Sequence, residues 1–198
     1  MRVERSATID QPVDRVFDYV STPENDPTWV PTSLRHEMLS PAPMRLGSIT
    51  EEDVWFLGRR MRYAWEITHY EPPSTFTLRS MSGAIPATIR VLLESLDGAR
   101  TRVILVGEVN LRGIYKPMEL VMRWVAREQF GTQLRTLRNL LESEAYRTNR
   151  VTTPGLTLPA AAGARRPHSR SPEVEVHHHR KRQLCYLRQL FMVQNTLL

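Results

Sequence analysis

The chain has 198 residues, of which 41% are hydrophobic and 24% are charged, so it can bury the core of one domain of ordinary size. Its single cysteine excludes a framework of intrachain disulfides. The formal net charge is +6, but up to residue 147 there are 19 basic and 19 acidic residues, and 148–198 add 8 basic and 2 acidic ones. The neutral first part therefore argues against nucleic-acid binding by a folded domain.

The first elements are a strand and a short helix. Residues 3–9 alternate as a strand does, Asp10 is in a position for an N-cap, and Pro12 fits the first helical turn. Apolar residues then occur at helical spacing, at Val13, Val16, Phe17 and Val20. The prolines that follow interrupt the chain, and we expect one irregular helical turn carrying Trp29 there.

Residues 33–112 predict six short strands, because alternating runs are separated by turn sequences such as Ser82-Gly83 and Asp97-Gly98. Residues 116–146 then predict one long helix of about 45 Å, at about 1.5 Å per residue. Gly131 within it favours a bend. Two apolar stripes of the helix are expected to face the core: Met118, Val121, Met122 and Val125, then Phe130, Leu134, Leu137 and Leu141.

The segment 148–198 is rich in proline, alanine and arginine and is predicted to be disordered, outside a folded domain of residues 1–147. Its last part, 183–198, has apolar residues after a basic block. A short amphipathic helix on a membrane or partner is one interpretation, and a solvated extension is the other.

This order of elements predicts an α+β fold in which one helix covers one face of an antiparallel sheet. The segments "ATIDQPVDRVFDYVSTPENDPTWVP", "LGRRMRYAWEITHYEPP", "GARTRVILVGEV" and "LRTLRNLLE" resemble the SRPBCC or START-like superfamily of polyketide cyclases, lipid-transport proteins and birch-pollen allergens. The resemblance covers residues 1 to about 145. It implies a helix-grip fold: a curved seven-stranded antiparallel sheet wrapped around a long C-terminal helix, two short helices after the first strand, and an apolar cavity between sheet and helix.

Hairpin register predicts which side chains face that cavity. A turn at 71–74 pairs His69 with Phe76, Ile67 with Leu78 and Trp65 with Ser80. A two-residue loop at Gly58 then places Glu52 on the same face as Tyr63 and Trp65. The predicted cavity lining is Trp29, Val54, Tyr63, Trp65, Ile67, Phe76, Leu78, Met118 and Met122, unless these residues simply fill a core.

Glu52 and His69 are the candidate catalytic or anchoring groups. A carboxylate among aromatic side chains loses hydration, which raises its pKa. A bulge would instead turn Glu52 to solvent. His69 precedes the turn, so we expect it at the rim of the cavity, where a structural role is the alternative.

The leading functional hypothesis is binding, transport or sequestration of a hydrophobic small molecule such as a lipid, isoprenoid or aromatic polyketide. The alternatives are a cyclase or dehydratase that uses Glu52 and His69, and an interaction or membrane-surface protein acting through its tail. The sequence has no nucleotide-binding, nucleophile-elbow or zinc-protease motif. We expect no cofactor or metal, although His177–His179 and Cys185 offer ligands, and a cytoplasmic location because no segment has the ~18 apolar residues of a membrane span.

Overall fold

The computed structural model describes residues 1–56, 58–83, 85–109 and 119–151, and the side chains of 144–151 are outside that description. Residues Met1–Arg150 form one compact unit. Beyond Val151, the predicted tail lies outside the described residues. The elements in chain order are β1 (Arg2–Ile9), α1 (Val13–Val20), the 3₁₀ turn η1 (Pro23–Asn25), α2 (Asp26–Trp29), β2 (Ser33–Met38), β3 (Ile49–Phe56), β4 (Arg59–Glu71), β5 (Thr75–Ser82), β6 (Ala87–Ser95), β7 (Thr101–Val109) and α3 (Glu119–Val151).

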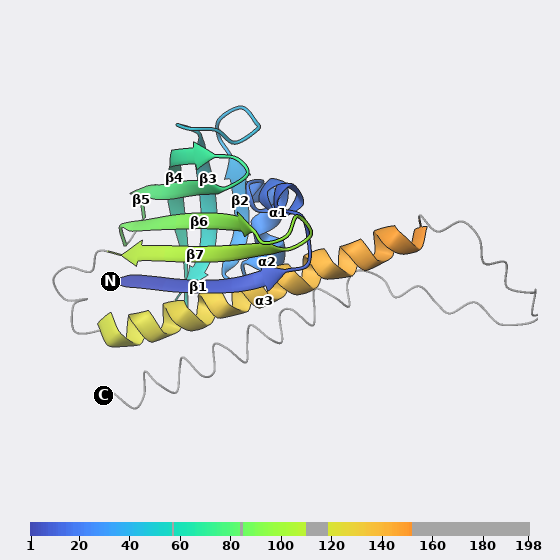
Figure 1. The fold of residues 1–198 in the computed structure, drawn as a ribbon. Helices are drawn as coiled ribbons and strands as arrows, with labels where there is room; N and C mark the ends of the chain where they lie inside the picture. Colours follow the sequence, from blue (N-terminus) through green and yellow to red (C-terminus); the bar gives the residue numbers. More distant parts are fainter. Residues whose placement is uncertain (57, 84, 110–118, 152–198) are drawn as a thin grey trace, which may run out of the picture. The chain divides into compact units, whose positions relative to one another are not determined.

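The seven strands form one antiparallel sheet in the order β1-β7-β6-β5-β4-β3-β2. Figure 1 shows a strongly curved sheet, with α3 running along one side of it and α1 and α2 near one end of the strands. Consecutive strands from β2 to β7 pair as neighbours, and β1 closes onto β7. The predicted α+β class, the six strands after the short helices and the long C-terminal helix are confirmed.

The start of α1 differs from the prediction. Pro12, not Asp10, is the N-cap, and the amide of Val16 donates to the Pro12 carbonyl at 3.2 Å. The backbone N–H of Asp10 donates instead to Glu142 of α3, also at 3.2 Å. Pro12 can begin the helix because its extended backbone and missing N–H suit the position before the first turn. The predicted apolar face is otherwise correct, since Val16, Phe17 and Val20 are buried.

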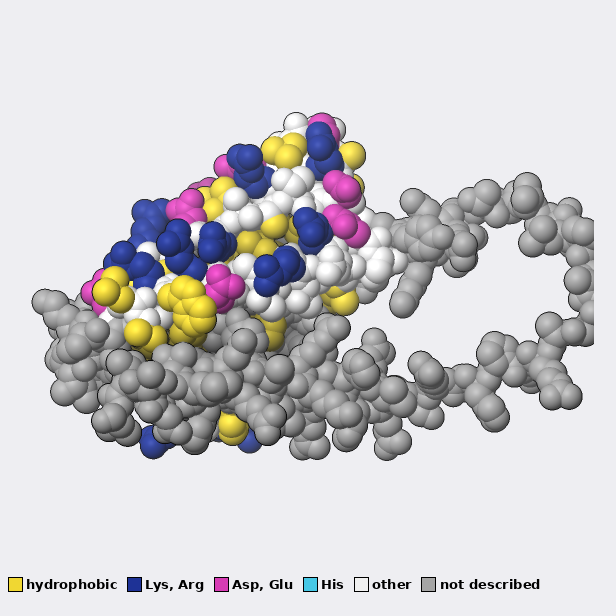
Figure 2. All heavy atoms as spheres, turned by 90° about the horizontal axis from the view of Figure 1, so that it is seen from below, with side chains coloured by type: hydrophobic (Ala, Val, Ile, Leu, Met, Phe, Trp, Pro, Cys, Tyr) yellow, Lys and Arg dark blue, Asp and Glu magenta, His cyan; other side chains and the backbone are white. Residues whose placement is uncertain are grey.

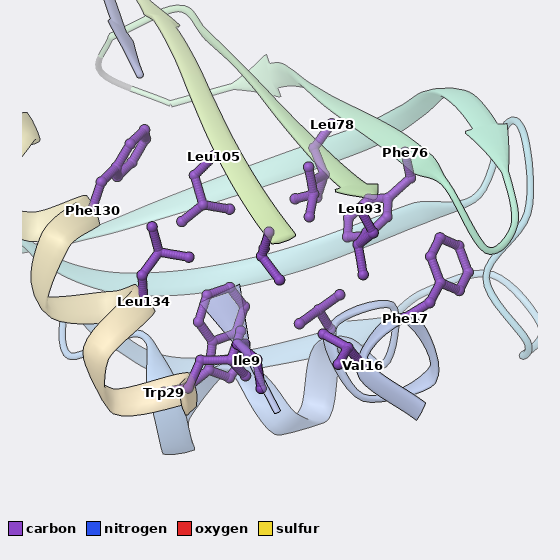
Figure 3. Close-up of a cluster of buried hydrophobic side chains, with 14 of the residues drawn as sticks. Ile9, Val16, Phe17, Trp29, Phe76, Leu78, Leu93, Leu105, Phe130 and Leu134 are labelled. Atoms are coloured by element: carbon purple, nitrogen blue, oxygen red, sulfur yellow. The ribbon is translucent and has the colours of Figure 1, made fainter. Parts of the chain in front are cut away.

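The core lies between the concave side of the sheet, the short helices and α3. Figure 3 shows Val16 and Phe17 of α1 on one side of this cluster and Phe130 and Leu134 of α3 on another. The second predicted stripe of α3 is buried as expected, and α3 continues through Gly131 without a break. Val121 was wrongly assigned to the first stripe, because it is 38% exposed whereas Met122 and Val125 are buried. Met118 lies outside the described residues.

Strand register confirms part of the predicted pairing. Glu52 pairs with Tyr63 across a two-residue loop that includes Gly58, whose φ of 75° is the left-handed conformation such a turn needs. Ile67 pairs with Leu78 and Trp65 with Ser80, both as predicted.

The predicted pairing of His69 with Phe76 is wrong: His69 pairs with Thr77, and Tyr70 pairs with Phe76. The cause is an extra residue in β4 between Ile67 and His69, which shifts the register by one. His69 is thereby turned outward and is 47% exposed, whereas the ring of Tyr70 contacts Phe17 with centroids 5.7 Å apart.

Charged side chains on the outside of the sheet occur mostly as pairs of opposite sign. Arg79 contacts Glu66 at 2.7 Å, and Arg2 contacts Glu4 at 3.0 Å. Figure 2 shows basic and acidic side chains interspersed on the face seen from below. Exposed pairs of this kind contribute little to stability.

Asp53, on the outer side of β3, differs from these exposed pairs because it is buried. Its side chain is only 3% exposed because two arginines cover it: Arg60 contacts Oδ2 at 2.6 Å, and the Nε of Arg62 donates to Oδ1 at 3.0 Å. Hydrogen bonds from Arg62 and Arg60 lower the pKa of Asp53 to about 2.

Replacing Asp53 with asparagine is expected to destabilise the protein at pH 7, because it removes the buried carboxylate that Arg60 and Arg62 both contact. Since the folded pKa lies below the unfolded value of 3.8, the contribution of Asp53 is complete above about pH 4 and is lost as the pH falls toward 2. Urea denaturation of wild type and Asp53→Asn at pH 7, 4 and 3 should show a difference that shrinks with acidity. A difference that stays constant over this range would contradict the ion-pair explanation.

Candidate functional site

A cavity of about 160 Å³ lies between the sheet and the helices. An apolar cavity of about 150 Å³ is large enough to hold a benzene-sized molecule. Most of its wall is apolar, and Figure 3 shows Trp29, Phe76, Leu78, Leu105 and Phe130 gathered around this part of the core. The lining residues are Val20, Pro23, Asp26, Trp29, Val30, Thr32, His36, Met44, Glu52, Val54, Trp65, Phe76, Leu78, Ile89, Val91, Leu105, Phe130 and Gln133.

Three ionisable side chains meet at one part of this wall. Asp26 is the first residue of α2, His36 is on β2, and Glu52 is on β3 directly opposite His36 in the strand pairing. A register shift between Ser33 and Arg35 gives His36 this inward position. One ligand atom from each of Asp26, His36 and Glu52 lies within 4.8 Å of the other two.

Hydrogen bonds fix the orientation of these groups. The Nδ1 of His36 is 2.6 Å from Oδ2 of Asp26, and its Nε2 is 2.7 Å from Oγ1 of Thr50. The indole N–H of Trp65 donates to Oε2 of Glu52 at 3.0 Å. Thr50 of β3 therefore orients the imidazole of His36, and Trp65 of β4 orients the carboxyl of Glu52.

Three buried polar atoms near this cluster have no hydrogen-bond partner among the described residues: Oδ1 of Asp26, Nε1 of Trp29 and Oγ of Ser33. Trp29 lies close enough to Asp26, and Ser33 close enough to Glu52, to oppose the rise in pKa of each carboxyl, although neither contact is a full hydrogen bond. Unpartnered buried polar atoms are uncommon in proteins, so the cluster has spare capacity for a ligand or a bound water.

Burial and mutual contacts shift the pKa of all three groups. Loss of hydration raises the pKa of Glu52, while the nearby imidazole of His36 opposes this effect. Loss of hydration likewise raises the pKa of Asp26 against its hydrogen bond to His36. Burial by itself would lower the pKa of His36, but the hydrogen bond and charge of Asp26 raise it overall. Two carboxyls and one imidazole thus share a poorly hydrated space.

The Asp26-His36-Thr50 series has the connectivity of a hydrolase triad, but Thr50 does not act as a nucleophile here. Thr50 is fully buried and does not line the cavity. An attacking oxygen must reach the substrate carbon, so Thr50 serves to orient the imidazole.

The structure brings several of the sequence-predicted site residues together. Glu52, Trp29, Val54, Trp65, Phe76 and Leu78 line the cavity. Tyr63 stacks on Trp65 with ring centroids 5.2 Å apart, and Ile67 is fully buried, but both are outside the lining, as is Met122. His69 is outside it too, with Nε2 3.4 Å from Glu71. The roles of all these residues in binding or catalysis stay predictions.

Asp26 and His36 were missed from the sequence. The loop between β2 and β3 is ten residues long, from 39 to 48. Unlike a two-residue loop, it does not determine which residues of the two strands face the same side of the sheet. The shift between Ser33 and Arg35 then reverses the alternation within β2. The sequence offers no signal that links these two side chains, since Asp26 lies in a proline-interrupted segment and His36 stands between Arg35 and Glu37.

A curved antiparallel sheet, a long C-terminal helix and a cavity between them define the helix-grip class. The chain belongs to the family described as polyketide cyclase/dehydrase and lipid transport, whose model matches residues 1–142. No curated protein matches the chain in sequence. None of the described helices is long and apolar enough to cross a membrane.

Solved structures with the same fold include the Zhui aromatase/cyclase of Streptomyces sp. R1128, at 14% identity and a TM-score of 0.63, over 73% of this chain and 95% of that one. A conserved protein from Geobacillus kaustophilus has 12% identity and a TM-score of 0.61, over 72% and 96%. A START superfamily protein from Mycobacterium smegmatis has 18% identity and a TM-score of 0.54, over 76% and 99%. At these identities the likeness establishes the fold.

Proposed function

We propose that this protein binds a hydrophobic small molecule in the cavity between the sheet and α3. The observation that supports this most is a mostly apolar, partly open cavity of about 160 Å³ that has one polar region in its wall. A domain that needed only a core would fill such a space, because protein interiors are close-packed and an empty volume costs stability. Membership of a lipid-transport and polyketide-cyclase family agrees with this use.

The volume limits the size of the ligand. It suits a molecule of one or two rings or a short isoprenoid, whereas pockets for drug-sized ligands measure about 300–1,000 Å³. A long-chain lipid or a polycyclic polyketide would need the lining to move. Burial of the ligand would stabilise the complex by about 25 cal/mol for each Å² of apolar surface removed from water. Glu52 and His36 would orient one polar group of the ligand.

The test is a fluorescence titration with 2-naphthol, a neutral two-ring probe. Trp29 and Trp65 line the cavity, so saturable quenching of tryptophan emission is expected. Val91→Phe should weaken the probe's affinity at least tenfold, because Val91 also lines the cavity and the larger ring would occupy it.

The matched control is Val121→Phe, on an exposed part of α3 outside the lining, which should leave the affinity unchanged. A Trp55→Phe background removes the contribution of a tryptophan that is exposed on the outer side of β3. Quenching that does not saturate, or equal affinity in wild type and Val91→Phe, would exclude the cavity as the binding site.

An enzyme that works by proton transfer in the same cavity is the second candidate. Glu52 and His36 both line the cavity and are adjacent, so a bound carbonyl or hydroxyl could meet an acid and a base. We infer that His36 is better placed than His69 for such a role. Glu52→Gln should then abolish turnover of a substrate that the variant still binds, and undiminished turnover would rule out the assignment. Action through the tail concerns residues outside the described part of the chain and stays a prediction.

A further inference from the structure

We propose that Asp26, His36 and Glu52 form a binding site for one divalent transition-metal ion of the Zn²⁺ or Mn²⁺ type. The proposal does not depend on hydrophobic-ligand binding, since it concerns only these three side chains. One imidazole and two carboxylates are ligands that these ions accept, whereas Ca²⁺ and Mg²⁺ prefer a shell of oxygens.

The spacing of the donor atoms fits a single ion. All three ligand atoms lie within 4.8 Å of one another. Zinc lies about 2.0–2.2 Å from nitrogen and carboxylate oxygen, so two ligands of one tetrahedral ion are about 3.4 Å apart. Side-chain rotations that move Nδ1 of His36 away from Oδ2 of Asp26, now 2.6 Å apart, and that bring the more distant ligand atoms closer by up to about 1.4 Å would close the site.

The surroundings support each ligand as a second coordination shell would. A metal-bound histidine usually donates its other ring N–H to an oxygen, and Nε2 of His36 is 2.7 Å from Oγ1 of Thr50, which leaves Nδ1 for the ion. Trp65 donates to Oε2 of Glu52 at 3.0 Å, which holds this carboxyl in place beside the site. Oδ1 of Asp26 is buried and has no partner among the described residues.

Charge also favours a cation. Two carboxylates face one imidazole in a space with little water, so full ionisation of both would leave excess negative charge. The 2.6 Å contact between Nδ1 of His36 and Oδ2 of Asp26 needs a proton between these atoms, and a cation would replace that proton. Because Asp26, His36 and Glu52 all line the cavity, the remaining coordination position would open to a ligand bound there.

Calorimetric titration of the full chain with ZnCl₂ tests the proposal. The side chains of His177, His178, His179 and Cys185 can also bind metal ions, so the parent protein carries glutamine at the three histidines and serine at the cysteine. We expect one Zn²⁺ per chain, release of protons on binding, and no comparable binding of Mg²⁺. Binding of Co²⁺ should give a visible absorption spectrum that Zn²⁺ abolishes.

In this parent, Asp26→Asn, His36→Gln and Glu52→Gln should each weaken Zn²⁺ binding at least tenfold. His69→Gln is the matched control, since His69 lies beside Glu71 on the outer side and should not matter. Circular dichroism identifies any variant that does not fold, and the Co²⁺ spectrum tests the parent without a substitution in the site. Absence of Zn²⁺ and Co²⁺ binding by the parent, or full affinity in the folded site variants, would overturn the proposal.

Discussion

Truncation of Leu137 to alanine is expected to lower the free energy of unfolding by about 2–5 kcal/mol. Leu137 lies on α3 and has no exposed surface, and the neighbouring Leu134 and Leu141 are buried in the same cluster. The substitution leaves a void where the helix contacts the sheet, and that void cannot close unless the helix shifts. Urea denaturation monitored by circular dichroism measures the loss.

Leu120→Ala is the matched control on the same helix. Leu120 is 76% exposed, so its truncation should change stability by no more than about 0.5 kcal/mol. Equal effects of the two substitutions would mean that the α3 face defined by Leu137 does not pack on the sheet.

Gly107→Ala is expected to destabilise the protein by about 1–3 kcal/mol and to weaken ligand binding. A Cβ at position 107 of β7 would lie 2.7 Å from Cζ and 3.0 Å from Cε2 of Phe130. The Phe130 ring would have to move, and Phe130 lines the cavity. Denaturation and the 2-naphthol titration measure the two effects.

A second substitution separates ring displacement from a change in the strand itself. Gly107→Ala combined with Phe130→Leu should recover part of the stability, because the smaller side chain makes room for the new methyl group. Gly131→Ala is the control: nothing lies within 4 Å of its added Cβ, and alanine favours a helix by about 1 kcal/mol, so stability should rise. Additive losses in the double variant would contradict the proposed contact.

Local patterns predicted most of the fold. Period-two alternation with turn sequences located every strand from β1 to β7, and the spacing of Phe130, Leu134, Leu137 and Leu141 identified the buried face of α3. Most errors occurred at places without such a pattern, but the error at Val121 occurred within one. Val121 is next to the buried Met122 in sequence, and one step along a helix turns a side chain by about 100°, which is enough to expose it.

The candidate site was predictable only where a short turn links its strands. A two-residue loop joins β3 to β4, so the sequence placed Glu52 beside Trp65 correctly. An extra residue in a strand changes which of the following side chains face the core. For this reason His69 faces outward and His36 faces inward, and neither orientation was expected. A bulge leaves little trace in a single sequence, because its signature is a mismatch between two strands.

By itself, the sequence determined the class of the fold, the neutral balance of its folded part and the inward direction of Glu52. These properties follow from composition and from contacts between near neighbours in the chain. Only the tertiary structure decided that Asp26 and His36 meet Glu52, and that a cavity of about 160 Å³ is left beside them. Both depend on how α2, β2 and α3 dock against the curved sheet, which is set by packing between distant segments and not by the pattern within any one of them.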